Sequence, residues 1–157
     1  MSNAAGGNAV LLFNRAADGA LSNAGNVSTG GAGQGSELGS QGALVLSQDH
    51  RWLLAANAGS NDVTVFSVTD DGLQFRSKTP SGGTAPVSIA IRDHLVYVLN
   101  AGTTNVTGFL DTGCLTVSEL QGDLSPGIRG SMFRQRLLIT YFTPNQPKAP
   151  TSISSLL

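Results

Sequence analysis

Two histidines in this chain follow aspartates directly, a pattern that can move protons. His50 follows Asp49, and His94 follows Asp93. An imidazole titrates near neutral pH and acts as a general acid or base when it is correctly placed. Both pairs fall in short polar turns between apolar runs, in equivalent places of a repeat, whereas a catalytic residue is usually unique. The recurrence therefore favours a structural role for both histidines.

Two loop segments also contain residue types that contact ligands. The stretch Gly30–Gly35 is glycine-rich, but it lacks the Lys-Ser/Thr of a phosphate-binding loop and precedes no helix, so a flexible loop is favoured. Thr84 and Ser88 lie where a loop crosses from one repeat to the next, and they would touch a ligand if that loop lined a channel. Neighbouring glycines and Pro86 favour a structural turn instead.

Other chemistry-bearing residues are too scattered to form a recognisable motif. The sequence has no Cys/His cluster with zinc spacing and no G-x-S-x-G nucleophile motif. Asp70 and Asp71 are adjacent but belong to a turn, and Cys114 reads as a small strand residue rather than a nucleophile. The sequence alone therefore assigns no catalytic residue, no metal site and no cofactor.

An internal repeat in the sequence indicates the strands and turns that would position these residues. The segment NAGSNDVTVF at residues 57–66 returns 43 residues later as NAGTTNVTGF at residues 100–109, and a looser copy occupies residues 3–13. A period in the forties, built from short strands and Gly/Asn turns, is typical of the blades of a β-propeller. The repeat therefore predicts an all-β fold.

Each full repeat contains four apolar or alternating runs separated by polar turns, which predicts two complete four-stranded antiparallel blades at about residues 43–80 and 88–121. The expected strands are 43–47, 51–56, 62–68 and 73–78, then 88–92, 95–99, 105–109 and 115–120. A half-blade with strands 9–14 and 20–27 precedes them. A second half-blade, near Met132 and residues 137–140, follows. The predicted architecture is a partial β-propeller of two blades flanked by two half-blades.

Two segments interrupt the repeat. Residues 29–42 contain six glycines and are expected to form a long loop between blades. Residues 141–157 contain three prolines and a Ser/Thr-rich end, so we expect an irregular or disordered tail after a propeller segment at residues 1–140.

Composition excludes several classes of partner. Only 12% of the residues are charged, the chain has 20 glycines, and the formal net charge is −1. Lys and Arg are scattered singly, which argues against nucleic acid and membrane surfaces as partners. No 18-residue apolar run and no signal-peptide pattern is visible, and the sequence leaves the cellular compartment unassigned.

Four segments resemble a known family, the seven-bladed β-propeller lactonases, which include propeller-type 6-phosphogluconolactonases and fungal carboxymuconate-lactonising enzymes. They are residues 38–47, 53–66, 80–88 and 96–102, and the resemblance extends over about residues 3–126. The resemblance implies hydrolysis of a sugar-acid lactone or a related cyclic ester. A non-catalytic propeller that presents a binding surface is the alternative.

The chain departs from this family in length and in its catalytic segments. Family members have seven blades and are roughly twice as long, and their histidine- and arginine-containing catalytic segments have no match here. The resemblance therefore implies a fragment that is inactive alone, with a small-molecule lactone as the ligand of the whole ring. Because an incomplete stack exposes blade edges, we also expect self-association through them.

Overall fold

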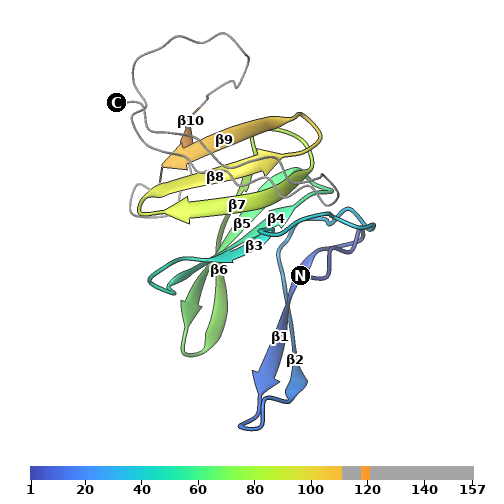
Figure 1. Ribbon diagram of the computed structural model, residues 1–157, viewed down its shortest axis with the longest axis vertical. Helices are drawn as coiled ribbons and strands as arrows, with labels where there is room; N and C mark the ends of the chain where they lie inside the picture. The colour runs from blue at the N-terminus through green and yellow to red at the C-terminus, as the bar shows by residue number, and fades with distance from the viewer. Residues whose placement is uncertain (111–117, 121–157) are drawn as a thin grey trace, which may run out of the picture. The chain divides into compact units, whose positions relative to one another are not determined.

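The computed structural model describes residues 1–110 and 118–120, all of which belong to one compact unit, Met1–Pro126. The described residues form ten β-strands and no α-helix, arranged as one two-stranded and two four-stranded antiparallel sheets (Figure 1). This all-β architecture, with sheets that do not close into a ring, confirms the predicted partial β-propeller.

The first four-stranded sheet follows the order of the chain. Its strands are β3 (Leu44–Leu46), β4 (Trp52–Asn57), β5 (Asp62–Thr69) and β6 (Gly72–Pro80), each hydrogen-bonded to the next. Short turns join them, as expected where consecutive antiparallel strands form hairpins. The central strands β4 and β5 are mostly buried, whereas β6 is largely exposed, which fits an outer strand.

The second four-stranded sheet repeats this arrangement. It contains β7 (Pro86–Arg92), β8 (Leu95–Asn100), β9 (Asn105–Leu110) and β10 (Ser118–Leu120), again paired in chain order. Strand β8 starts 43 residues after β4, and β9 starts 43 residues after β5. The structural repeat therefore has the same period as the sequence repeat.

The chain opens with a hairpin that corresponds to the second half of a blade. Strand β1 (Ala9–Arg15) pairs with β2 (Leu21–Ser28), and the register shifts between Leu12 and Phe13. An equivalent shift falls between Val65 and Phe66 where β5 pairs with β6. The hairpin therefore matches β5–β6, with Phe13 in the place of Phe66.

Two apolar clusters cover the two faces of the first four-stranded sheet. Side chains alternate along a strand, so Leu54 packs toward the second sheet while Ala55 packs toward the opening hairpin. The inter-sheet cluster joins Val65 to Val98 and Phe109, all nearly inaccessible to solvent. Burying each such side chain contributes about 1.5–3 kcal/mol. The sheets stack on each other as neighbouring propeller blades do.

The turns that contain the histidines are equivalent, but the histidines are not. His50 has a φ of 59° in the β3–β4 turn, and Asp93, 43 residues later, has a φ of 52° in the β7–β8 turn. His94 therefore corresponds to Arg51 rather than to His50. Because of this one-residue offset, the two histidines occupy different positions in their turns. They therefore do not share one repeated role.

Several predicted segments lie outside the described residues. These are the beginning of the expected strand 115–120, the second half-blade near Met132 and residues 137–140, the tail at residues 141–157, and Cys114. Within the described part of the chain, no helix is long and apolar enough to cross a membrane.

Candidate functional site

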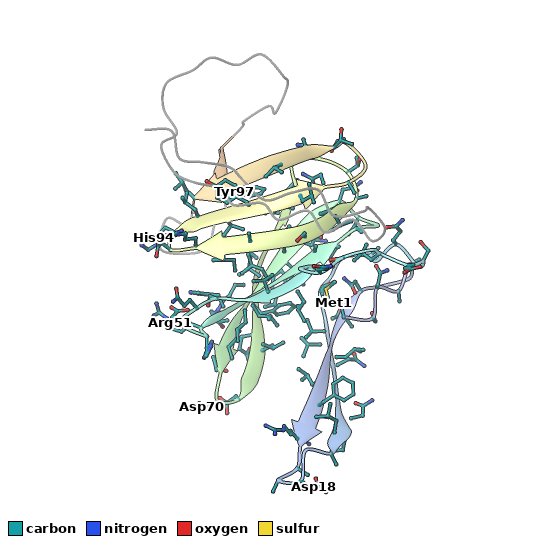
Figure 2. All side chains as sticks on the ribbon, viewed as in Figure 1. Met1, Asp18, Arg51, Asp70, His94 and Tyr97 are labelled. Atoms are coloured by element: carbon teal, nitrogen blue, oxygen red, sulfur yellow. The ribbon has the colours of Figure 1, made fainter. Side chains whose placement is uncertain are left out.

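The loops gather at two opposite ends of the four-stranded sheets. Strand β4 runs from Trp52, next to the His50 turn, to Asn57, next to the crossing loops. At about 3.3 Å per residue, these ends are roughly 17 Å apart. Figure 2 shows Arg51 and His94 on the same side of the two sheets, and Asp70, at the tip of the β5–β6 hairpin, lies toward that side as well. Each end is a candidate site.

Asn57 organises the crossing-loop end through a buried hydrogen-bond network. Its Nδ2 donates to Asp62 Oδ1 at 2.6 Å and to Thr64 Oγ1 at 2.9 Å. Its Oδ1 accepts from Asn8 Nδ2 at 2.9 Å and from Thr29 Oγ1 at 2.8 Å. The network ties the opening hairpin and the long loop to the first sheet, and its buried polar groups satisfy one another.

The equivalent residue of the second sheet, Asn100, is less completely bonded. Its Nδ2 donates to Ser81 O and to Thr107 Oγ1, both at 3.1 Å. Its buried Oδ1 has no hydrogen-bond partner among the described residues. One of the two missing bonds is explained by Ser81. It follows β6 as Thr29 follows β2, but its hydroxyl donates to Gly83 O and not to the asparagine.

The structure places the loop candidates of this end in packing roles. Thr84 is exposed, and its backbone N donates to Thr103 Oγ1 while its carbonyl accepts from Gly102 N. Ser88 is half-buried on β7, where a Cβ added to Gly42 would lie 2.7 Å from its hydroxyl oxygen. Thr84 therefore links two loops, which supports the structural-turn interpretation, whereas Ser88 lies within a strand at a close approach between neighbouring segments.

The glycine-rich stretch is also part of this packing. Gly31 O accepts from Asn8 N at 2.8 Å, and Gly30 O accepts from Lys78 Nζ at 2.7 Å. The carbonyls of the stretch therefore face donors of the protein, whereas an anion-binding loop presents its N–H groups to the ligand. This geometry supports the loop interpretation over phosphate binding.

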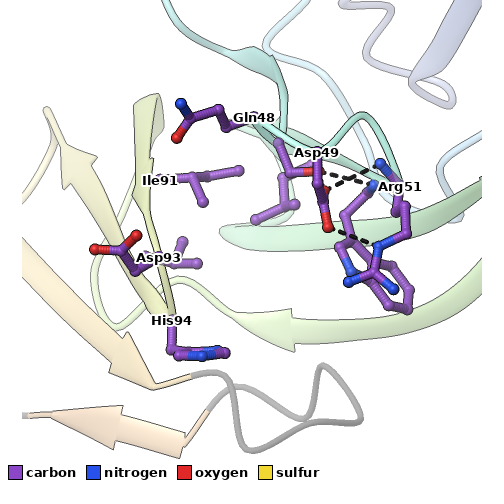
Figure 3. A pocket seen from close by; sticks show the side chains of 10 residues that line it. Gln48, Asp49, Arg51, Ile91, Asp93 and His94 are labelled. Atoms are coloured by element: carbon purple, nitrogen blue, oxygen red, sulfur yellow. Dashed lines mark hydrogen bonds and ion pairs between the residues drawn. The ribbon is translucent and has the colours of Figure 1, made fainter.

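The opposite end contains a pocket of about 430 Å³ between the β3–β4 and β7–β8 turns (Figure 3). Leu54, Ile91 and Val96 supply apolar lining from both sheets. The remaining lining residues are polar, charged or aromatic: Ser47, Gln48, Asp49, Arg51, Trp52, Asp93 and His94. Both Asp candidates and His94 therefore meet at one hollow, whereas His50 does not line it.

Asp49 holds the first wall of the pocket in place. Its Oδ1 accepts from Ser47 Oγ at 2.6 Å, and its Oδ2 accepts from Arg51 Nε at 2.6 Å. The Ser47 hydroxyl, followed by the Arg51 side chain and backbone, holds the pKa of the Asp49 carboxyl well below its usual range. Asp49 is therefore ionised at neutral pH, where it anchors the turn and is a poor proton acceptor.

The second wall is more open. Asp93 lies 4.0 Å from Arg92 Nε, and both side chains are more than four-fifths exposed. The positive φ of Asp93 suits a short polar side chain that tolerates the left-handed region. This wall therefore offers an accessible carboxylate and the imidazole of His94.

The arrangement can bind a small polar ligand more readily than it can catalyse a reaction. Hydrolysis needs a base and a donor group directed at the developing oxyanion. The Arg51 guanidinium already engages Asp49, and both walls are exposed to water, which weakens electrostatic interactions. Within residues 1–110 and 118–120, no three His, Cys, Asp or Glu side chains are grouped to hold a metal.

Sequence reasoning missed two features of these ends. The network centred on Asn57 depends on Asn8 and Thr29, which are far from it in the chain. The sequence does not indicate that Trp52 lines the pocket, because an aromatic residue at the start of a strand is typical of a buried core position. The only sequence signal for the pocket was the pair of polar turns with Asp49 and Asp93.

Comparison with known proteins places this geometry in context. The family model for the lactonase, 7-bladed beta-propeller, matches residues 7–124. A crystal structure of a protein from Lactobacillus plantarum is 26% identical with a TM-score of 0.59, covering 72% of this chain and 34% of that one. The periplasmic gluconolactonase of Pseudomonas aeruginosa is 26% identical with a TM-score of 0.57, covering 72% and 33%. A comparison with curated proteins found no match. The chain spans about one third of the length of these solved structures.

Proposed function

The chain belongs to the seven-bladed β-propeller lactonase family, and from this we propose that its blades form part of a ring that hydrolyses a sugar-acid lactone. The observation that carries the proposal is the family match over residues 7–124, which covers the opening hairpin and both four-stranded sheets. The Pseudomonas aeruginosa structure, which is a periplasmic gluconolactonase, supports a sugar-acid lactone as the substrate class.

The activity belongs to the ring rather than to the two blades alone. Lactone hydrolysis needs a general base to activate water and a cation or N–H donor at the developing oxyanion. Among the described residues, the pocket carboxylate Asp49 has a lowered pKa and is paired with Arg51. The missing groups therefore come from other blades, and we expect this chain alone to hydrolyse no lactone above the spontaneous rate.

A chimera tests this proposal. Residues 7–120 of this chain would replace the matching segment of the Pseudomonas aeruginosa gluconolactonase, and ring opening of glucono-δ-lactone would be followed by proton release. Hydrolysis by the chimera, with none by the chain alone, supports a lactone-hydrolysing ring. A folded chimera that opens lactone at the spontaneous rate would instead favour the alternative, a non-catalytic propeller that presents a binding surface.

We also propose that the chain self-associates through its opening hairpin. Strand β5 pairs with both β4 and β6, whereas its counterpart β1 pairs only with β2 within the described part of the chain. Three large apolar side chains of this hairpin are exposed: Leu11 by 42%, Phe13 by 54% and Leu21 by 66%. An unpaired strand edge beside exposed apolar side chains favours strand addition by a second copy.

A further inference from the structure

The pocket between the β3–β4 and β7–β8 turns combines an apolar base with a polar rim. Trp52 and Ile91 are half-buried and pack against the inter-sheet core while they line the pocket. Pockets with this mixture of apolar lining and a few polar groups, at volumes of about 300–1,000 Å³, are typical of small-molecule sites. The 430 Å³ hollow falls within this range.

The charges around the rim are balanced. Asp49 is paired with Arg51 at 2.6 Å, and Asp93 faces Arg92 at 4.0 Å. The lining contains no lysine. Because each carboxylate has one arginine beside it, the rim has no excess of positive charge to attract a phosphorylated or otherwise dianionic ligand, so it favours an uncharged ligand.

The rim also has hydrogen-bond acceptors that are accessible to a ligand with many hydroxyl groups. The Asp93 carboxylate is largely exposed, and Figure 3 shows it and Gln48 at the edge of the hollow. Ionised carboxylates accept hydrogen bonds only, which matches the O–H groups of a polyol. The indole of Trp52, which also lines the pocket, offers a flat surface on which the C–H face of a sugar ring can pack.

We propose that this pocket binds a neutral sugar ring, with the apolar ring face against Trp52 and the hydroxyl groups on Asp93, Asp49 and Gln48. The site goes beyond the proposed lactonase activity, because it lies at the end of the sheets opposite the crossing loops and needs no catalytic group. Its exposed rim implies weak binding, with a dissociation constant on the order of millimolar.

The chain provides its own probe for this site. Trp52 is the single tryptophan of the sequence, so its fluorescence reports on the pocket without background. Titrations of the full chain with methyl β-D-glucoside and with glucose 6-phosphate, at constant ionic strength and up to about 100 mM, would follow the Trp52 emission. We expect a saturable change with the neutral glucoside and an affinity at least about fivefold lower for the phosphorylated sugar.

Two variants link the binding to the rim. Asp93→Asn removes the carboxylate and keeps a residue that tolerates positive φ, and we expect it to weaken glucoside binding about fivefold. Asp70→Asn makes the same change in the β5–β6 turn and should leave binding unchanged. Saturation-transfer NMR on the glucoside measures the same affinities independently of fluorescence, and circular dichroism shows whether each variant is folded.

Three results would overturn the proposal. The first is no saturable signal with the glucoside by either fluorescence or NMR. The second is equal or tighter binding of glucose 6-phosphate, which would contradict the neutral rim. The third is an equal loss of affinity in folded Asp93→Asn and Asp70→Asn proteins. The lactone assay of the chimera is a separate measurement, so failure here leaves the proposed activity standing.

Discussion

Asn57 and Asn100 occupy equivalent places in the two sheets, but their side chains differ in how well they are bonded. Asn57 makes four buried hydrogen bonds through its amide, whereas Asn100 makes two and leaves its Oδ1 without a partner among the described residues. Removing a buried side-chain amide lowers the free energy of unfolding most where it leaves several hydrogen-bond partners unsatisfied.

We therefore expect Asn57→Ala to lower the free energy of unfolding by about 2–4 kcal/mol, and Asn100→Ala by about 1 kcal/mol. Urea unfolding of the two variants, followed by the Trp52 emission, provides the comparison. Equal losses for the two variants would show that the extra hydrogen bonds of Asn57 contribute nothing.

The charge of Asp49 should depend on its two neighbours. Because the folded-state pKa of Asp49 is lowered, its stabilising contribution is present above the ordinary carboxyl range and is lost as the pH falls below that range. Carbon-detected NMR titration should place the Asp49 midpoint below about 3.9, the ordinary value for aspartate. We expect Ser47→Ala to raise this midpoint most and Arg51→Gln to raise it less. A midpoint that neither variant moves would contradict the assigned causes.

The strands themselves could be predicted from the sequence, and the reason is physical. The polar–apolar alternation of the β5 sequence, the continuous apolar run of β8 and the turn residues around them reflect local preferences that need no knowledge of the rest of the fold. The predicted strand 62–68 and the observed Asp62–Thr69 differ by one residue at the end. Strand ends fray, so differences of this size are expected.

The candidate site could be predicted only in part, because it depends on which turn faces which. Asp49 and Asp93 were identified as neighbours of histidines, and the structure brings both to one pocket. Trp52 lines the pocket and His50 does not. Both facts follow from the packing of two sheets whose turns are 43 residues apart. Local sequence patterns do not encode that packing.

The long loop at residues 29–42 is held to the first sheet by close contacts. A Cβ added to Gly31 would overlap the Asn57 amide and approach Asp62 Oδ1 to 2.7 Å. A Cβ added to Gly6 would meet nothing within 4 Å. We expect Gly31→Ala to lower the free energy of unfolding by about 1–3 kcal/mol, with little change for Gly6→Ala. Similar unfolding midpoints for both variants in urea would show that this loop is not held tightly.

The whole chain should self-associate through the opening hairpin. Replacing Phe13 with serine removes an apolar side chain that is 54% exposed. Because Phe13 contributes little buried area, we expect Phe13→Ser to shift the weight-average mass toward the monomer without lowering the thermal midpoint. Sedimentation velocity measures the mass, and Phe75→Ser, at a 56% exposed position on β6, is the matched control. An unchanged mass distribution for Phe13→Ser would exclude the hairpin as the contact.

The catalytic efficiency of the chimera with the Pseudomonas aeruginosa gluconolactonase tests the central claim most directly. If residues 7–120 supply competent blades of a lactonase ring, kcat/KM for glucono-δ-lactone should fall within about 100-fold of the parent enzyme, a loss of less than roughly 3 kcal/mol in transition-state stabilisation. A chimera with a cooperative thermal transition but a rate equal to spontaneous ring opening would contradict the assignment of these blades to a lactone-hydrolysing ring.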